Sequence, residues 1–565
     1  MRIVSEQSYV CGISEKPLLY KTIGQALDDA ADRWGSRDAL IVRQQNVRLN
    51  YAELKAQADS LAAGLLALGL EPGDRVGIWS PNRVEWVLTQ FATAKAGLIL
   101  VTINPAYRTA ELEYALNKVE CKALIAAPYF KSSDYVGMVR ELEPELDISE
   151  PGNLKSDRLP DLKIVAIMGD KTPKGCLAFD DIAKRARPES RARLAEITPT
   201  LSPDDPINIQ FTSGTTGFPK GATLTHNNIL NNGYFVGEAQ RFTEQDRLCI
   251  PVPLYHCFGL TMAVLNCVTH GSAMVFPGEA FEPLSVLETV AAEKCTALYG
   301  VPTMFIAELE HPDFKKFDLS SLRTGIMAGA PCPVEVMKRV ISEMHMTDVT
   351  IAYGMTETSP VSFQTSPDDP LDKKVGSVGR VHPFVEVKII DENGRIVPRG
   401  QKGELCTRGY SVMRGYWNDA EKTRESLDEG GWMHTGDLAI IDEKGYCNIV
   451  GRVKDMIIRG GENVYPREIE EFLYRHKSIQ DVAVFGVPDP KYGEEVCAWI
   501  KVKDGSSITE EDVVAFCKGQ IAHYKIPKHI RFVDAFPMTV TGKIQKFVMR
   551  DEMAKELGRR EEVTA

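Results

Sequence analysis

The sequence predicts an α/β protein: a large N-terminal domain of doubly wound sheets plus a β-rich subdomain, and a small mobile α+β C-terminal domain. Three observations lead to this prediction. The chain of 565 residues exceeds the size of one ordinary hydrophobic core. Between residues 40 and 350, apolar strand-like runs alternate with helical patterns, which is typical of parallel sheets covered by helices. Beyond this region, the pattern changes first to hairpins and then to a compact mixture of helices and strands.

The N-terminal domain is expected to span residues 1–450, and hydrophobic periodicity locates its elements. The clearest predictions are strands at 75–79, 98–102, 272–276 and 297–299, and helices at 84–96, 284–293 and from Met304 onward. The polar stretch 141–161 is rich in Pro, Asp and Glu, so we expect it to be a surface excursion.

Residues 385–450 are expected to form the β-rich subdomain. Strands at 385–390 and 403–407 flank Asn393-Gly394, a dipeptide favoured in hairpin turns. A further turn is expected at Lys444-Gly445.

The C-terminal domain is expected to span residues 451–565. Its helices should begin at Pro466 and after Thr509, which can cap a helix together with Asp512. Strands at 482–487, 496–502 and around 530–533, and a terminal helix, complete the predicted module.

Composition excludes several classes of protein. A formal net charge of −12 argues against a nucleic-acid-binding protein, because such proteins carry basic faces. The charge-free window 258–276 is long enough to cross a membrane, but it contains His270 and several polar residues. We therefore expect a buried helix followed by a strand, and no transmembrane segment.

The twelve cysteines include no C-x-x-C pair, so their spacing indicates neither a zinc site nor a disulfide framework. Reduced thiols and an N-terminus without a secretory or transit signal favour a cytoplasmic location.

A run rich in Gly and hydroxyl residues follows the apolar strand-like segment 207–211. Glycines let a backbone approach a ligand closely, while hydroxyl and amide groups can donate hydrogen bonds to a polyphosphate. The spacing differs from that of the P-loop of kinases and GTPases, since only two residues separate Gly214 from Gly217 and glycine follows Lys220. The candidate phosphate-binding residues are Thr212, Ser213, Gly214, Thr215, Thr216, Gly217 and Lys220.

Five further blocks follow this loop in the sequence. They are Ala328-Gly329-Ala330-Pro331, Tyr353-Gly354-Met355-Thr356-Glu357, Thr435-Gly436-Asp437, Gly451-Arg452-Val453-Lys454-Asp455 and Thr541-Gly542-Lys543. Together and in this order, the six blocks closely resemble those of the adenylate-forming (AMP-binding) superfamily: acyl-CoA synthetases, luciferases and peptide-synthetase adenylation domains. The resemblance covers residues from about 19 to 553. Segments 253–259, 454–463 and 544–547 are most similar to medium-chain fatty acyl-CoA synthetases of the acyl-CoA synthetase family member 2 type.

The resemblance implies a nucleotide site for ATP and Mg²⁺. The loop would hold the β- and γ-phosphates, Glu357 would bind the metal, and Thr356 would hydrogen-bond the α-phosphate. Tyr353 would lie against adenine, next to the backbone of Gly329, Ala330 and Pro331. Asp437 and Arg452 would bind the ribose.

The resemblance also implies a two-step reaction with a domain movement. Lys543 would bridge the carboxylate and the α-phosphate during adenylation, and would then leave so that coenzyme A can enter. Lys454 occupies the hinge position of the family. The movement would bring Arg459, Gly460 and Gly461 to the path of the pantetheine arm.

The substrate side of the site is expected to be apolar. The candidate wall residues are His256, Phe258, Val301, Met304 and Phe363, although ordinary core packing explains the last three equally well. No acidic residue is evident that would pair with a substrate amine, which favours a fatty or aryl acid over an amino acid. An aryl or other carboxylic acid:CoA ligase and a catalytically silent adenylate-binding sensor remain alternatives, and a homodimer is left open.

Overall fold

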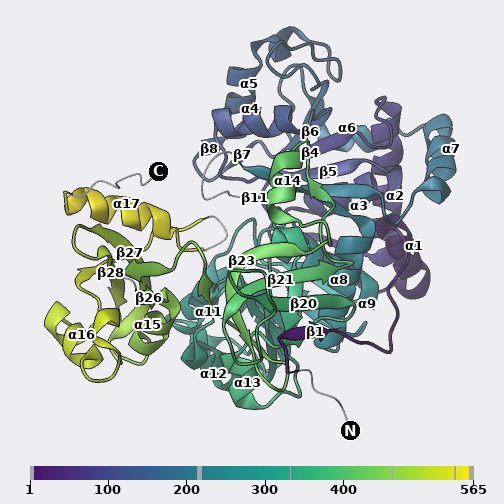
Figure 1. Ribbon diagram of the computed structural model, residues 1–565. Coiled ribbons are helices and arrows are strands. Elements are labelled where there is room, and N and C mark those ends of the chain that lie inside the picture. Colours follow the sequence, from purple (N-terminus) through teal and green to yellow (C-terminus); the bar gives the residue numbers. More distant parts are fainter. Residues whose placement is uncertain (1–5, 213–218, 331, 461, 540–542, 559–565) are drawn as a thin grey trace.

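The computed structural model describes residues 6–212, 219–330, 332–460, 462–539 and 543–558, and shows a large body beside a smaller C-terminal one (Figure 1). The large body extends from β1 (Tyr9–Cys11) to β24 (Cys447–Arg452), and the small one from β25 (Ile457–Arg459) to α17 (Lys546–Glu556). The α/β fold class is therefore confirmed. Strand β24 crosses the expected boundary after residue 450 and ends two residues later.

The first sheet of the large body has eight strands. Those from β10 to β11 are parallel, whereas β12 and β22 add antiparallel pairs at one edge. In spatial order the strands are β10 (Leu177–Ala178), β9 (Ile164–Ile167), β6 (Ala123–Ala126), β4 (Arg75–Trp79), β5 (Ile99–Thr102), β11 (Pro206–Thr212), β12 (Lys220–Thr225) and β22 (Gly415–Tyr416).

The second sheet has nine strands, parallel from β17 to β2 and antiparallel at both edges. In spatial order they are β19 (Arg380–Val381), β18 (Val361–Gln364), β17 (Asp348–Gly354), β16 (Thr324–Ala328), β15 (Ala297–Gly300), β13 (Arg247–Cys249), β14 (Ala273–Phe276), β2 (Asp38–Val42) and β3 (Val47–Asn50). Adjacent parallel strands β16 and β17 end side by side, which places the blocks that follow them close together.

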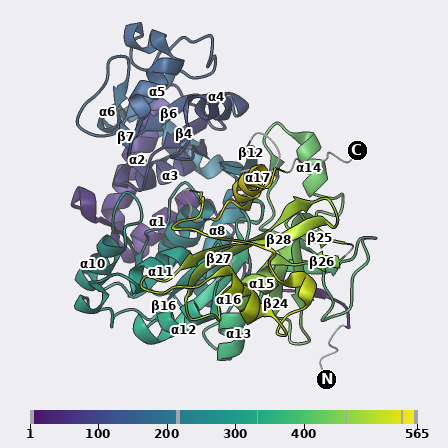
Figure 2. The same cartoon turned by 90° about the vertical axis from the view of Figure 1, so that its left-hand side faces the viewer.

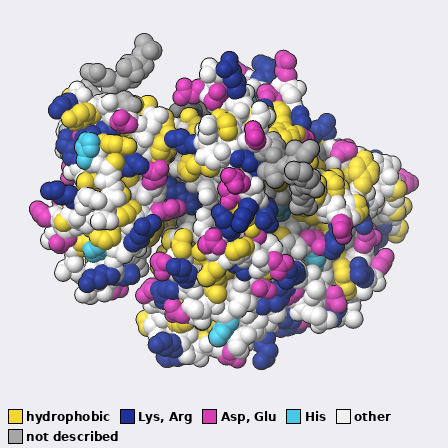
Figure 3. Space-filling view, turned by 60° about the horizontal axis from the view of Figure 1, so that its bottom comes forward, with side chains coloured by type: hydrophobic (Ala, Val, Ile, Leu, Met, Phe, Trp, Pro, Cys, Tyr) yellow, Lys and Arg dark blue, Asp and Glu magenta, His cyan; other side chains and the backbone are white. Residues whose placement is uncertain are grey.

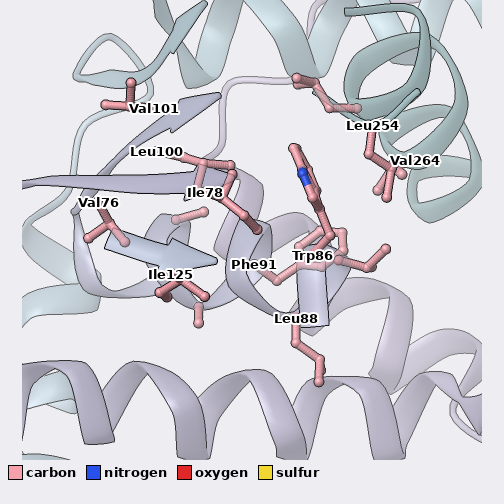
Figure 4. Packing of buried hydrophobic residues seen from close by; sticks show 14 of the residues in the cluster. Val76, Ile78, Trp86, Leu88, Phe91, Leu100, Val101, Ile125, Leu254 and Val264 are labelled. Carbon is pink, nitrogen blue, oxygen red and sulfur yellow. The ribbon is translucent and has the colours of Figure 1, made fainter. Parts of the chain in front are cut away.

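Buried helices lie between the two sheets. Helix α3 (Val84–Ala96) is buried from its second residue to its last, as expected for a helix that is covered on all sides. Figure 4 shows Trp86 and Phe91 of this helix between strand residues such as Ile78 and the segment that carries Leu254 and Val264. All these side chains belong to one hydrophobic cluster, which joins the two sheets into a single body.

The window 258–276 forms a π-helix (Phe258–Leu265), helix α9 (Asn266–His270) and strand β14, as the sequence predicts. Among the described residues, no helix is long and apolar enough to cross a membrane. On the face shown in Figure 3, Lys and Arg side chains are interspersed with Asp and Glu.

The β-rich part is a five-stranded sheet in which the expected hairpin is present. Its order is β1, β20 (Val385–Ile390), β21 (Gly403–Gly409), β23 (Met433–Ile441) and β24. The N-terminal strand β1 pairs with β20 across more than 370 positions of sequence. Three residues carry too little periodicity for sequence analysis to detect this strand.

The small body contains three α-helices and a sheet that is antiparallel except for the parallel pair β28–β29, and it faces the viewer in Figure 2. Its strands are β26 (Glu462–Val464), β25, β28 (Gly493–Val502), β27 (Ile479–Asp489) and β29 (His529–Phe532), and its helices are α15 (Pro466–Leu473), α16 (Glu510–Cys517) and α17. The predicted cap is confirmed, since Thr509 and Asp512 form a capping box.

Most predicted elements agree with the structure to within a few residues, and two of the differences have the same clear cause. The helix expected from Met304 is α11 (Pro302–Leu309), which begins two residues earlier. Proline is well suited to the first turn of a helix because the amide hydrogen that it lacks has no partner there. The helix predicted at 284–293 is α10 (Pro283–Glu293), which begins in the same way.

Candidate active site at the domain junction

The candidate phosphate-binding run lies between two antiparallel strands, β11 and β12. Thr212 ends β11 and pairs with Lys220 at the start of β12, where the Thr212 hydroxyl donates to the Lys220 carbonyl at 3.4 Å. The run therefore ends in regular strand rather than in a longer turn. Ser213, Gly214, Thr215, Thr216 and Gly217 lie outside the described residues.

Tyr416 links this hairpin to the expected metal ligand. The Lys220 ammonium lies 4.2 Å from the centre of the Tyr416 ring, and the Tyr416 hydroxyl donates to Glu357 Oε1 at 2.8 Å. Desolvation and the neighbouring Glu357 carboxylate raise the pKa of Tyr416, so this hydroxyl stays protonated and remains a donor. Sequence analysis missed Tyr416, because strand β22 brings it beside β12 from almost 200 residues away.

Glu357 and Thr356 lie just after β17, in the 3-10 helix Thr356–Thr358, with little solvent exposure, 6% and 9% respectively. Glu357 has one carboxylate oxygen bonded to Tyr416, and its backbone carbonyl accepts from the Met413 amide at 2.9 Å. The Thr356 hydroxyl lies 4.0 Å from the Cys257 thiol. A fixed, buried carboxylate is an oxygen ligand of the kind that Mg²⁺ prefers.

The nucleoside-binding candidates are joined by hydrogen bonds. The Tyr353 hydroxyl donates to Asp437 Oδ2 at 2.6 Å, and Arg452 Nε donates to Asp437 Oδ1 at 3.1 Å. Desolvation and the Asp437 charge raise the pKa of Tyr353 well above its ordinary value. A carboxylate has about four acceptor positions, so Asp437 can still accept from two sugar hydroxyls.

The backbone expected to line the adenine follows β16 directly. Gly329 has φ +86°, and a Cβ atom there would lie 3.2 Å from Val301, so glycine suits both the backbone angle and the space. Ala330 is half-buried beside it. Pro331 lies outside the described residues.

A β-bulge positions Asp437. The register between β21 and β23 shifts between the pairs Glu404–Leu438 and Cys406–His434, which leaves two extra residues in β23. Gly436 adopts φ +69° in this bulge, and the Asp437 amide donates to the Thr435 hydroxyl at 3.1 Å. Bulges commonly redirect a side chain next to a functional site.

The substrate-wall candidates divide into two groups. Phe258, Val301 and Met304 are nearly buried members of the central cluster between the sheets, and the Phe258 ring lies 5.6 Å from that of Tyr299. Phe363 instead belongs to the second cluster, fully buried, with its ring 6.2 Å from that of Tyr353. The structure therefore places Phe363 apart from the other three wall candidates, next to the adenine-binding candidate.

His256 is half-buried at the start of the segment that carries Phe258. Its Nδ1 accepts from the Phe258 amide at 3.2 Å and lies 3.5 Å from the Cys257 thiol. Desolvation and the charge of Lys543 lower the pKa of His256 to about 3, which makes this imidazole neutral at physiological pH.

Lys543 extends from the small domain to the other candidates. Desolvation at the junction lowers its pKa, Arg452 lowers it further, and Glu357 and Asp437 act in the opposite direction. Lys543 is nevertheless exposed, so water still reaches its side chain. The lysine is thus close enough to both the metal and the ribose candidates to interact with them electrostatically.

The structure does not bring the predicted coenzyme A segment to this site. Arg459 forms an ion pair with Glu495 at 2.7 Å and stacks on Tyr492 at 4.3 Å, both within the small domain. Gly460 has φ +58° in the same hairpin, and Gly461 lies outside the described residues. Lys454 is exposed in the turn between β24 and β25, as expected for a connecting segment.

Comparisons with known proteins identify related sequences and structures. The sequence model of the AMP-binding enzyme family matches residues 27–417, and that of the AMP-binding enzyme C-terminal domain matches residues 468–543. The protein YngI of Bacillus subtilis is 51% identical over 95% of this chain and 97% of its own. The human mitochondrial medium-chain acyl-CoA ligase ACSF2 is 47% identical over 97% of this chain and 90% of its own.

Solved structures show the same architecture. The anthranilate CoA ligase AuaEII in complex with anthranoyl-AMP aligns with a TM-score of 0.84 and 27% identity, over 96% of this chain and 99% of that one. ATP-bound MatB from Rhodopseudomonas palustris aligns with a TM-score of 0.81 and 31% identity, over 94% of this chain and 99% of that one. On the basis of both domain matches and the near-complete coverage, this chain belongs to the AMP-binding enzyme family.

Proposed function

We propose that the protein is an ATP-dependent, AMP-forming acyl-CoA synthetase that converts a fatty acid, of medium chain length, into its CoA thioester through an acyl-adenylate. The observation that carries the proposal is the position of Lys543. Lys543 comes from a separate domain, and its ammonium interacts electrostatically with both the expected metal ligand Glu357 and the expected ribose ligand Asp437. A silent adenylate-binding sensor would not need this cation at the reaction centre.

Adenylation requires a carboxylate to attack the α-phosphate of ATP, so two anions must meet. Catalysis then depends on positive charge and on fixed geometry. Lys543 supplies an ammonium that bridges carboxylate and α-phosphate oxygens, and Lys220 supplies a second cation at the base of the phosphate hairpin. The Thr356 hydroxyl donates to the α-phosphate.

The residues present also suit Mg²⁺. Glu357 offers a buried carboxylate whose position the Tyr416 hydroxyl fixes. When bound, Mg²⁺ would neutralise phosphate charge as a Lewis acid. Outer hydrogen bonds of this kind hold a ligand in the orientation that a metal requires.

Thioester formation requires a different arrangement of the two domains, with a division near residue 450. The present arrangement suits adenylation, because Lys543 is at the site while Arg459 is paired with Glu495 within its own domain. Rotation about the exposed turn at Lys454 would withdraw Lys543 and bring the 459–461 segment to the site. Such turns commonly absorb the backbone changes of a domain closure.

The substrate class follows from the apolar wall and from the relatives. Phe258, Val301 and Met304 offer no charge, and the human relative is named a medium-chain acyl-CoA ligase. AuaEII is named an anthranilate CoA ligase, so an aryl acid is the second candidate. An assay of AMP release in the presence of CoA distinguishes a fatty acid from an aryl acid as the substrate. The acids to compare are straight-chain acids of increasing length, benzoate and anthranilate.

Amino acids should not be substrates. Burying an unpaired ammonium costs several kcal/mol. Glu308, one turn after Met304 on α11, is buried, and desolvation raises the pKa of its carboxyl well above the usual range, which opposes a charged partner for an ammonium. We expect octanoate to support ATP–pyrophosphate exchange while leucine and phenylalanine do not. Efficient exchange with leucine would contradict the fatty-acid assignment but not adenylation itself.

Replacing Asp437 with alanine should raise KM for ATP. Charge-assisted hydrogen bonds contribute about 1.5–3 kcal/mol each, which corresponds to about ten- to a hundredfold in KM. The same substitution at Glu443, exposed in the following turn, is the matched control and should leave KM unchanged. Equal KM values for ATP in both variants would contradict the assignment of Asp437 to the nucleotide site.

The pH dependence of kcat/KM should not show a titration of His256. With its pKa lowered to about 3, the His256 imidazole is already neutral above pH 5. We therefore expect the ratio of kcat/KM for the fatty acid between wild type and His256→Gln to be constant from pH 5.5 to 8. A ratio that changes near the ordinary histidine pKa would show that His256 gains a proton during the reaction.

A further inference from the structure

A cluster of potential metal ligands lies on the five-stranded sheet, outside the proposed reaction centre. Glu404 and Cys406 belong to β21, and His434 is the cross-strand partner of Cys406 on β23. The ligand atoms of the three side chains lie within 4.8 Å of one another. Among the residues that the structure describes, this is the one group of three His, Cys, Asp or Glu side chains whose ligand atoms lie this close together.

Two of the three separations between ligand atoms fit a single small ion, and the third lies within 4.8 Å. His434 Nδ1 lies 3.2 Å from Glu404 Oε2 and 3.6 Å from Cys406 Sγ. A tetrahedral zinc ion, with bonds of about 2.3 Å to sulfur and about 2.0–2.2 Å to nitrogen or oxygen, places its ligand atoms about 3.2–3.7 Å apart. The two measured separations fall in this range without any rearrangement of side chains.

The surroundings provide an outer partner and an entry path. Asp428 Oδ2 lies 3.8 Å from His434 Nε2, on the opposite edge of the ring from the cluster. A carboxylate in this place orients a metal-binding histidine. Glu404 and His434 side chains are 27% and 33% exposed, so an ion can enter from solvent.

Two features oppose a cation and have to be overcome. The Cys406 thiol is buried and would have to lose its proton on binding. Lys388, the strand partner of Cys406 on β20, carries a positive charge, but its ammonium lies 4.4 Å from the Trp432 ring centre. Once Cys406 is a thiolate, it carries a negative charge together with the carboxylates of Glu404 and Asp428. These three negative charges outweigh the positive charge of Lys388.

We propose that Glu404, Cys406 and His434 form a three-residue binding site for a divalent transition-metal ion of the Zn²⁺ type, with water as the fourth ligand. The thiolate and imidazole favour Zn²⁺ or Co²⁺ over Mg²⁺, which prefers oxygen ligands. The site is thus chemically distinct from the Mg²⁺ position at Glu357. It also adjoins the nucleotide site, because Glu404 Oε1 accepts from the Gly436 amide at 3.2 Å in the bulge that holds Asp437.

Cobalt titration of the full-length protein, after removal of metal with a chelator, tests this site. Tetrahedral Co²⁺ absorbs strongly in the visible region, and a thiolate ligand adds a charge-transfer band in the near ultraviolet. We expect both signals to saturate at one Co²⁺ per chain and to disappear when one equivalent of Zn²⁺ is added. Cys406→Ser should abolish the charge-transfer band, and His434→Gln should weaken Co²⁺ binding at least tenfold.

Other cysteines provide the controls. Cys11→Ser removes the exposed thiol, and Cys447→Ser removes a buried thiol from the same sheet, so neither change should affect the titration. Circular dichroism shows whether each variant is folded. If Cys406→Ser does not fold, His434→Gln still tests the site, because His434 is only half-buried and its replacement disturbs the fold less. The proposal is overturned if wild type gives no charge-transfer band, if the band persists in folded Cys406→Ser, if His434→Gln binds as tightly as wild type, or if the band is lost in Cys11→Ser.

Discussion

Replacing Lys543 with alanine should lower the rate of adenylation about 100- to 1,000-fold, the effect of removing one preorganised group that stabilises transition-state charge. The transfer of a supplied acyl-adenylate to CoA should stay close to the wild-type rate. Mutual repulsion between carboxylate and α-phosphate disappears once pyrophosphate has left, so the ammonium has no role in the second step. ATP–pyrophosphate exchange measures the first half-reaction, and thioester formation from synthetic acyl-adenylate measures the second.

Lys546 provides the matched control for this experiment. It lies three residues further along the chain, and its ammonium pairs with Glu470 Oε1 at 2.7 Å within the small domain. Lys546→Ala should therefore leave ATP–pyrophosphate exchange within a fewfold of wild type. If Lys543→Ala instead damaged both half-reactions equally, the lysine would have a structural role and the domain movement would lose its main support.

The second large effect is expected at Glu357. Glu357→Gln removes the negative charge from the proposed metal ligand, and an amide is a poorer ligand for a hard cation than a carboxylate. We expect adenylation to fall sharply and to need much more Mg²⁺ for half-maximal exchange. The measurement is ATP–pyrophosphate exchange over a Mg²⁺ series at saturating ATP.

Tyr416→Phe separates metal binding from general damage to the site. It keeps the ring beneath Lys220 and removes only the hydroxyl that bonds to Glu357. Loss of an outer partner typically costs ten- to a hundredfold in metal affinity. Tyr416→Phe should therefore shift the Mg²⁺ requirement while excess Mg²⁺ restores the rate. Loss of activity that Mg²⁺ cannot restore in Tyr416→Phe would contradict this role.

Sequence analysis predicted those parts of the fold that depend on local pattern. Helix 84–96 and strands 75–79 and 385–390 have the predicted bounds, because each has a periodic apolar pattern and clear flanking residues. Strands β1 and β22 were not predicted, since they are only three and two residues long. Their pairing depends on contacts that no local window contains.

The same distinction applies to the site. Tyr353 and Asp437 were chosen from short sequence blocks, and the structure joins them through a hydrogen bond of 2.6 Å. Tyr416 was missed because its contact with Glu357 spans 59 residues and depends on β-strand pairing. The Glu404, Cys406 and His434 cluster escaped spacing rules for a related reason: its ligands come from two strands in register rather than from a C-x-x-C pair.

The position of Arg452 determines what moves when the domains rearrange. Arg452 is the last residue of β24, and so it belongs to the same sheet as Asp437, with the connecting turn beginning at the next residue. Rotation about that turn would therefore leave both proposed sugar contacts in place while Lys543 departs. The reactive mixed anhydride would stay attached through its nucleoside end during the whole exchange of partners. Retention of the intermediate and access for the thiol would thus be governed by different parts of the chain, so that one can change without the other.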